Sequence, residues 1–403
     1  MIINTLNKIL EYSFYGLFFF VPLALTPLNY ELFEYNKMML IYAITAIIVG
    51  AWVGKMIWNQ KILLRPTPFD IPIALFFASQ VISYFYSIDR HVSFWGYYSR
   101  FHGGLLSTIA YILLYYAFVS NFKKEHISRL IGIALGSGIL ISFYGILEHF
   151  SHSPSCLFFT GKFDVSCWVQ DVENRVFATL GQPNWLAAYL AILIPIALYQ
   201  SMKKLQTPNS KLQTIAAFFL PIIFYVTLLF TKSRSGFIAS LVTQGLFWLV
   251  LFYRSKEKIK KPFVIFNVFL IVLTIIISTP FEQINRVMYS FAPLQIIRKT
   301  LHPQAEIPLS QIAGPALETG GTESGEIRRI VWKGALDIAK HYPLFGTGVE
   351  TFAFAYYQYR PVEHNLTSEW DFLYNKAHNE FLNYLAIVLN GGEHKFQILE
   401  EGV

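Results

Sequence analysis

Long apolar runs recur along the chain and are separated by short polar connections. A helix needs about twenty apolar residues to cross the roughly 30 Å hydrocarbon layer of a bilayer. We expect nine spans of about this length, at residues 12–28, 36–57, 68–87, 104–120, 129–149, 185–202, 213–231, 236–253 and 262–280. A tenth run begins at Ala377 and turns polar after about fourteen residues, so we expect the last span to be short or truncated. The pattern predicts an all-α polytopic membrane protein with about ten transmembrane helices.

Composition supports this class. Only 14% of the residues are Asp, Glu, Lys or Arg, and hydrophobic residues make up 54% of the chain. Soluble proteins carry about 25% charged residues. With a mean hydropathy of +0.43, the composition argues against a soluble enzyme. The chain has two cysteines, too few for a disulfide-framework fold.

Lysine and arginine are distributed unequally between alternate connections. If the N-terminus lies in the cytoplasm, the N-terminal end and the inner connections hold fifteen of them, and the short outer connections hold seven. Because cytoplasmic loops are enriched in these residues, we expect a cytoplasmic N-terminus. The net charge of +7 is then mostly anchoring charge that meets anionic membrane lipid. No nucleic-acid partner is expected.

The predicted spans divide the chain into three parts. Residues 1–280 form a transmembrane bundle of about nine helices, residues 281–376 a long extracytoplasmic segment, and residues 377–403 the start of a further helix with a polar, apparently truncated tail. Within the middle part, residues 326–343 have the periodic apolar positions of a helix lying on the membrane surface. A second helix is expected at residues 349–360.

Isolated arginines stand at span boundaries on the predicted outer side. They are Arg100, Arg175 and Arg234. A guanidinium close to hydrocarbon costs about 3 kcal/mol or more, so each is expected to have a partner. Its planar fork binds two phosphate oxygens at once, and several arginines on one face would bind a lipid-linked phosphate or diphosphate. Chloride or a carboxylate would also fit, and each arginine alone could be an interfacial anchor.

Two further positions add to this outer face. Arg328 or Arg329, on the expected surface helix, could extend the arginine group, although a solvated helical face explains them equally well. His378 lies at the mouth of the last apolar run, where a neutral imidazole can take a proton from a hydroxyl group. A hydrogen-bonded structural histidine is the alternative.

Other chemistry has weaker support. The ten histidines form none of the spacings typical of metal sites, so we expect no metal and no cofactor. Cys156 and Cys167 lie in a predicted outer connection, where the environment is oxidising. A disulfide between them and two free thiols both fit the sequence.

Several stretches resemble one family, the O-antigen ligases and polymerases that act on undecaprenyl-diphosphate-linked glycans. The matching stretches occur in the family's order and on one predicted side of the membrane: SFWGYYSRFHGGLL, RVFATLGQPNWLAAYLA, TKSRSGFIASLV, IRRIVWKGALDIAKHYPLFGTGVETF and AHNEFLNYLA. Together they cover most of residues 90–390. The family consists of metal-independent, inverting glycosyltransferases with about a dozen transmembrane helices and a large periplasmic segment. The resemblance therefore implies a location in the bacterial cytoplasmic membrane.

The resemblance also implies roles for individual residues. Arginines would hold the diphosphate of the donor, and a histidine would assist the acceptor hydroxyl of a glycolipid, glycan or protein. Arg234 matches the arginine of the SRSG stretch and His378 the histidine of the HN stretch. Arg328 matches the arginine before the tryptophan better than its neighbour does, and Arg175 and Arg100 match less closely.

Two other functions remain open. A transporter or flippase for an anionic lipid or glycolipid would use the same arginines but would need no base. An inactive homologue is the third hypothesis, because the family pattern continues through further helices after the HN stretch. The sequence does not distinguish a ligase from a polymerase or a protein oligosaccharyltransferase.

Overall fold

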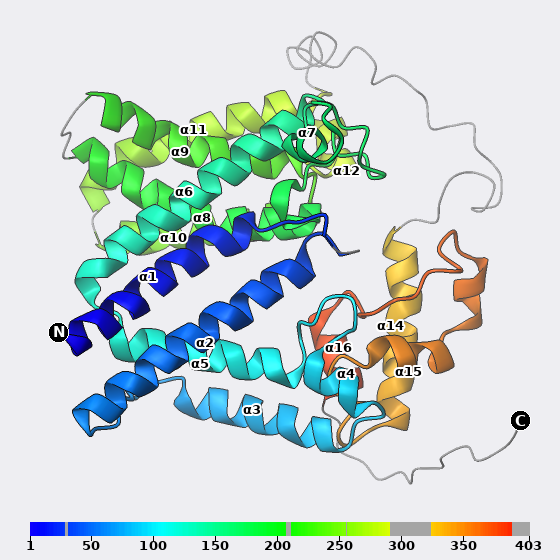
Figure 1. Cartoon of the computed structure of the whole chain (residues 1–403). Helices are drawn as coiled ribbons and strands as arrows, with labels where there is room; N and C mark the ends of the chain where they lie inside the picture. Colours follow the sequence, from blue (N-terminus) through cyan, green and yellow to red (C-terminus); the bar gives the residue numbers. More distant parts are fainter. Residues whose placement is uncertain (29–30, 207–210, 255, 291–323, 389–403) are drawn as a thin grey trace, which may run out of the picture. The chain divides into compact units, whose positions relative to one another are not determined.

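The computed structural model describes residues 1–28, 31–206, 211–254, 256–290 and 324–388 (Figure 1). Every regular element within these residues is a helix. The polar tail predicted after the last apolar run lies outside the described residues. Much of the long segment predicted between the ninth span and the surface helix also lies outside them.

A long helix occurs at each of the nine expected spans. These helices are α1 (Ile2–Leu23), α2 (Glu34–Asn59), α3 (Asp70–Phe85), α5 (Leu105–Asn121), α6 (Lys124–His149), α8 (Pro183–Gln206), α9 (Lys211–Phe230), α10 (Arg234–Arg254) and α11 (Lys256–Ile277). Among the described residues, α2, α6, α8, α10 and α11 are long and apolar enough to cross a membrane, and α3, α5 and α9 contribute shorter apolar helices. The predicted class, an all-α polytopic membrane protein, is confirmed.

Helix α1 begins about ten residues before the predicted first span. Lys8 and Glu11 set the predicted start, because charged residues interrupt an apolar run. The structure continues the helix through them, since Leu6 and Leu10 keep the helical spacing of apolar residues and Leu10 is buried.

Short helices also form inside the connections. They are α4 (Arg90–Trp95), α7 (Pro154–Thr160), α12 (Glu282–Met288), η1 (Ala178–Leu180) and η3 (Val362–Leu366). The sequence contains start signals for two of them. The Asp89 carboxylate accepts a hydrogen bond from the Val92 amide and caps α4, and Pro154 occupies the first turn of α7.

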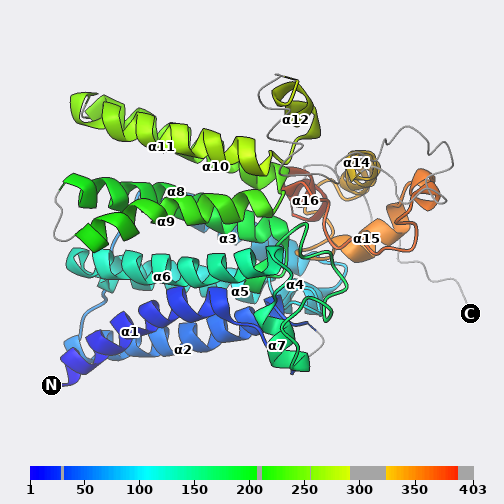
Figure 2. The ribbon, with the colours of Figure 1, turned by 90° about the horizontal axis from the view of Figure 1, so that it is seen from above.

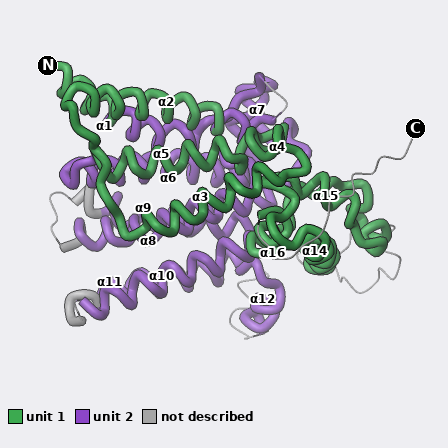
Figure 3. Tube along the Cα trace, turned by 90° about the horizontal axis from the view of Figure 1, so that it is seen from below, with its two compact units in different colours: residues 1–10, 38–121, 308–403 green, residues 11–37, 122–307 purple. Residues whose placement is uncertain are grey.

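The chain divides into two compact units (Figure 3). Unit 1 contains residues 1–10, 38–121 and 308–403, and unit 2 contains residues 11–37 and 122–307. This division rests on contacts and does not test the predicted division by membrane exposure, which stays a prediction.

In unit 2 the core forms around α8. Its fully buried residues Leu186, Leu190, Ile194 and Leu198 repeat every four positions, so one face of the helix is continuously apolar. This helix packs against α9 and α10, and α9 also packs against α6; Figure 2 shows α6, α8 and α9 side by side. Gly236 permits the close approach of α10, because a Cβ there would lie 2.2 Å from the Ala187 side chain.

In unit 1 a second core forms around α14 (Ser324–His341), the helix predicted at residues 326–343. Ile327, Val331 and Ile338 are buried against α15 (Phe352–Tyr359) and α16 (Glu380–Ile387). The apolar face that we expected to lie on a membrane is thus largely covered by protein. The periodicity is the same in both cases, so the sequence could not distinguish them.

Candidate functional site

His378 stands directly before α16, in a segment that the structure fixes on both sides. The side chain of Asn379 caps α16 by accepting hydrogen bonds from the amides of Phe381 and Leu382, at 3.1 and 3.3 Å. The Ala377 amide donates to Oδ1 of Asn383, one turn into the helix, at 3.3 Å. His378 itself has a positive φ of 52°. This left-handed conformation is uncommon for residues other than glycine.

Helix α14 holds the same segment from another side. The indole Nε1–H of Trp332 donates to the carbonyl oxygen of Ala377 at 3.0 Å. The ring of Tyr374 meets the imidazole of His378 edge to face, with centroids 5.4 Å apart. His378 is therefore carried by α14 and α16 together rather than by a free loop.

The surroundings of His378 favour a neutral imidazole. Its side chain is exposed on one side, but the protein around it limits access of water, and this partial desolvation is the main cause of a lowered pKa. The positive charge of Arg328 lowers the pKa further, and Arg100 and Lys376 act in the same direction. The charge of Glu369 opposes them. At neutral pH the ring can therefore accept a proton.

Arg328 lies on α14 one turn before Trp332, and its side chain is exposed. Its charge adds to the lowering of the His378 pKa, and it partly opposes the burial that raises the pKa of Tyr374. The neighbouring Arg329 is also exposed. Adjacent residues on a helix point about 100° apart. Of the two arginines, Arg328 is the one whose charge affects the pKa of His378.

Arg100 belongs to a tightly closed loop between α4 and α5. A Cβ on Gly96 would lie 2.5 Å from the carbonyl oxygen of His102, and one on Gly104 would lie 2.4 Å from the amide nitrogen of Gly96. Only glycine fits these contacts. The hydroxyl of Tyr42, on α2, donates to the carbonyl oxygen of Phe101 at 3.0 Å. The loop thus holds Arg100 in a defined place in unit 1.

A second HN pair in the chain shows what a structural histidine looks like. His364 is fully buried. Its Nε2 lies 3.1 Å from the carbonyl oxygen of Glu369, which can only accept, so Nε2 carries the proton and Nδ1 accepts from the Tyr356 hydroxyl at 2.7 Å. Burial lowers the pKa of His364. Both of its ring nitrogens are used inside the fold, whereas His378 is accessible from outside.

Arg234 is the first residue of α10 in unit 2. Ser233 precedes it and caps the helix: its hydroxyl accepts from the Gly236 amide at 3.1 Å and donates to Oδ1 of Asn184 at 2.8 Å. The Arg234 Nε donates to the carbonyl oxygen of Pro280 at 3.4 Å, and its guanidinium lies 5.9 Å from the ring centroid of Phe281. The side chain is exposed.

Arg175 reaches the same turn. Its Nε lies 3.5 Å from the carbonyl oxygen of Thr231, three residues before Arg234. Lys232 in this turn is exposed on one side, and its pKa is lowered mainly because the protein around it limits the access of water; Asp171 opposes the shift, and Arg175 adds to it. Unit 2 therefore gathers Arg175, Lys232 and Arg234 around one turn, while Arg100, Arg328 and His378 all lie in unit 1.

Cys156 and Cys167 form a disulfide in the connection between α6 and α8, with their Cα atoms 5.4 Å apart. The bond joins α7 to the following loop. The indole N–H of Trp168 donates to the Ser153 hydroxyl at 3.0 Å and attaches the loop at a second point.

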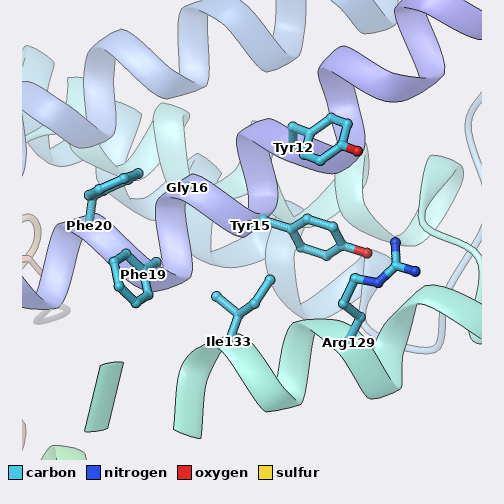
Figure 4. Close-up of a pocket in the computed structure, with 7 residues that line it drawn as sticks. All are labelled: Tyr12, Tyr15, Gly16, Phe19, Phe20, Arg129 and Ile133. Atoms are coloured by element: carbon cyan, nitrogen blue, oxygen red, sulfur yellow. The ribbon is translucent and has the colours of Figure 1, made fainter. Parts of the chain in front are cut away.

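A surface cavity of about 500 Å³ lies between α1 and α6 in unit 2 (Figure 4). Its walls are mostly aromatic, and Arg129 stands at one end, 3.3 Å from the Glu11 carboxylate. None of the predicted site residues lines it. The predicted orientation places Arg129 near the cytoplasm.

Three polar residues belong to or contact the segment that carries His378, and no sequence motif predicts them. They are Trp332, Glu350 and Lys376. Lys376 stands two residues before His378, and its Nζ lies 3.4 Å from Oε1 of Glu350. The only signal for Trp332 was its place in the stretch that carries the resemblance.

Comparison with protein families finds a match. Residues 216–388, a little under half of the chain, match the family described as O-antigen ligase. The matched region contains Arg234, Arg328 and His378. The match supports the predicted resemblance: the protein is a multi-pass membrane protein, and this part of it is similar to the O-antigen ligase family, whose members act in the assembly of cell-surface glycans. Comparison with curated proteins and with solved structures finds no match.

Proposed function

We propose that the protein is an O-antigen ligase-like glycosyltransferase. It transfers a glycan from an undecaprenyl-diphosphate donor to a hydroxyl of a glycolipid, glycan or protein acceptor. The reaction is an inverting displacement that needs no metal, at the extracytoplasmic face of the bacterial cytoplasmic membrane. The observation that carries the proposal is His378, an accessible histidine whose pKa is lowered by limited access of water and by Arg328.

In the proposed reaction, arginines stabilise the leaving diphosphate and His378 accepts the proton of the acceptor hydroxyl. As the bond between the anomeric carbon and the diphosphate oxygen breaks, negative charge grows on the leaving oxygen. Arginines that bind this charge more tightly in the transition state lower the barrier. The acceptor hydroxyl attacks from the opposite face of the sugar, and its proton passes to the neutral ring of His378. The products are the elongated acceptor and undecaprenyl diphosphate.

We assign diphosphate binding to Arg234, Arg328, Arg175 and Arg100. The assignment rests on the resemblance of the stretches that contain these arginines, and Arg234 and Arg328 also lie within the matched residues 216–388. In support, Arg234 and Arg328 have exposed side chains that a ligand can reach.

The assignment of diphosphate binding can be tested with the two neighbouring arginines on α14, Arg328 and Arg329. Arg328→Lys keeps the charge but loses the two-pronged contact with phosphate oxygens, so donor affinity should fall about tenfold or more. Arg329→Lys is the matched control and should bind the donor normally. Equal effects of the two changes on binding of a lipid-diphosphate glycan to the purified protein would contradict the assignment.

A transporter or flippase for an anionic glycolipid remains the second candidate, because it would use the same exposed arginines. It requires no base. Loss of transfer after removal of the His378 imidazole therefore separates the two functions.

A further inference from the structure

Glu350 is a buried carboxylate that the proposed reaction does not use. It is 6% exposed and has a positive φ of 59°. A buried charge is costly unless it is paired, and Lys376 supplies the partner at 3.4 Å. Lys376 is itself largely covered, with 27% of its side chain exposed. The pair therefore lies in unit 1, and Lys376 stands two residues before His378.

The same carboxylate rests on the loop that carries Arg100. A Cβ added to Gly103 would lie 2.2 Å from Oε1 of Glu350, so any side chain there would displace the carboxylate. Gly103 also has a φ of 82°, which favours glycine. Glu350 thus contacts the Arg100 loop through Gly103 and the His378 segment through Lys376.

The backbone around Glu350 is anchored on two further elements. The Ser93 hydroxyl, on α4, donates to the carbonyl oxygen of Val349 at 2.7 Å. The amides of Thr347 and Gly348 donate to the carbonyl oxygens of Ala386 and Ile387, at the end of α16, at 3.2 and 3.0 Å. The backbone that carries the Glu350 carboxylate is therefore held in place by hydrogen bonds to α4 and to the end of α16.

Several charges act on His378 from the elements around it. Arg328 acts from α14, Arg100 from the loop after α4, Lys376 from the same segment, and Glu369 from the loop after η3; the Tyr374 ring touches the imidazole. Three of the four charges are positive. A negative charge that pairs with one of them limits the positive potential at the ring.

We infer that Glu350 and Lys376 are positioning residues: their ion pair joins the Arg100 loop to the His378 segment and balances the charge beside the imidazole. The role in catalysis rests on the proposed function, but the balance of charge does not. If Glu350 is neutralised, Lys376 acts on His378 without compensation, and the imidazole becomes harder to protonate. If Lys376 is neutralised, the imidazole becomes easier to protonate. The two changes should act in opposite directions.

The test compares Glu350→Gln, Lys376→Met and the double variant in the full chain. Diethyl pyrocarbonate reacts with neutral imidazole but not with protonated imidazole. Mass spectrometry of the modified His378 side chain therefore gives the pH at which this ring is neutral in half of the molecules, without any need for activity. We expect this midpoint to fall by about half a pH unit or more in Glu350→Gln, to rise in Lys376→Met, and to return close to the original in the double variant. Lys376→Arg keeps the charge and should leave the midpoint unchanged.

Shifts in the same direction, or no shift in either single variant, would overturn the inference. Lys376→Met removes the less buried partner of the pair. If Glu350→Gln fails to fold, the direction of the midpoint shift in Lys376→Met decides the test. The acid limb of the pH profile of transfer should move with the modification midpoint. Failure of the proposed function is seen in a separate experiment. If a His378→Ala protein still transfers glycan, His378 is not the base. The modification midpoints of the other variants still show whether the Glu350–Lys376 pair affects the charge at His378.

Discussion

The indole N–H of Trp332 donates to the carbonyl oxygen of Ala377 at 3.0 Å, and this hydrogen bond attaches the helix that carries Arg328 to the residue directly before His378. Arg328 and Trp332 are one helical turn apart, so they lie on the same side of α14. The cation proposed to hold the donor and the base proposed to accept the proton are thus fixed to one rigid element. Catalytic groups need such support, because small displacements cost large factors in rate.

Removal of this hydrogen bond should affect transfer more than donor binding. Trp332→Phe keeps an aromatic ring but removes the donor, so we expect the free energy of unfolding to fall by about 0.5–1.5 kcal/mol. The transfer rate should fall because His378 loses its support, while donor affinity changes little. Denaturation and single-turnover transfer assays measure the two effects. Trp370→Phe, at an exposed tryptophan of the same unit, is the control; an equal loss of transfer in both would contradict the prediction.

Arg234→Lys should lose most transfer activity although the charge is kept. An ammonium group cannot reproduce the two-pronged contact of guanidinium with phosphate oxygens. Arg254→Lys, at the opposite end of α10, provides the control on the same helix. Near-normal transfer by Arg234→Lys in membranes would contradict the role in diphosphate binding and would favour Arg234 as an interfacial anchor.

The long helices could be predicted from the sequence because a span must be long and almost uncharged. The start of α1 was predicted incorrectly because Lys8 and Glu11 interrupt an apolar run without ending the helix. Two short helices could have been found from their caps at Asp89 and Pro154.

The assembly of the candidate site was less predictable. Periodicity identified α14, but an apolar face has the same pattern whether lipid or protein covers it. The hydrogen bond from Trp332 is accepted by a backbone carbonyl oxygen, which every residue has, so the sequence does not indicate the partner. The Glu350–Lys376 pair joins residues far apart in the chain, and only the folded structure brings them together.

The orientation in the membrane is tested with reporter fusions. The excess of lysine and arginine in alternate connections predicts a cytoplasmic signal from fusions after residues 60, 125, 207 and 258. Fusions after residues 95, 165 and 320 should give an outer signal. An outer signal from residue 207 would contradict the topology and the proposed extracytoplasmic site.

The disulfide predicts a simple labelling pattern. Thiol reagents added to the unfolded, unreduced protein should label neither Cys156 nor Cys167, and after reduction they should label both. Replacing both cysteines with serine should lower the stability of this connection by about 3 kcal/mol, because the closed loop restricts the unfolded chain. Full labelling before reduction would show that other contacts hold the connection.

The most direct test of the account is His378→Ala, with donor binding and glycan transfer measured separately on the purified protein and a lipid-diphosphate glycan. His341→Ala, at the exposed end of α14, is the control. Because the arginines are proposed to hold the diphosphate, donor binding should stay largely intact, and transfer should fall by about 10²- to 10⁴-fold, as is typical for loss of a general base. Unchanged transfer by a folded His378→Ala protein would contradict the role of His378 as the base.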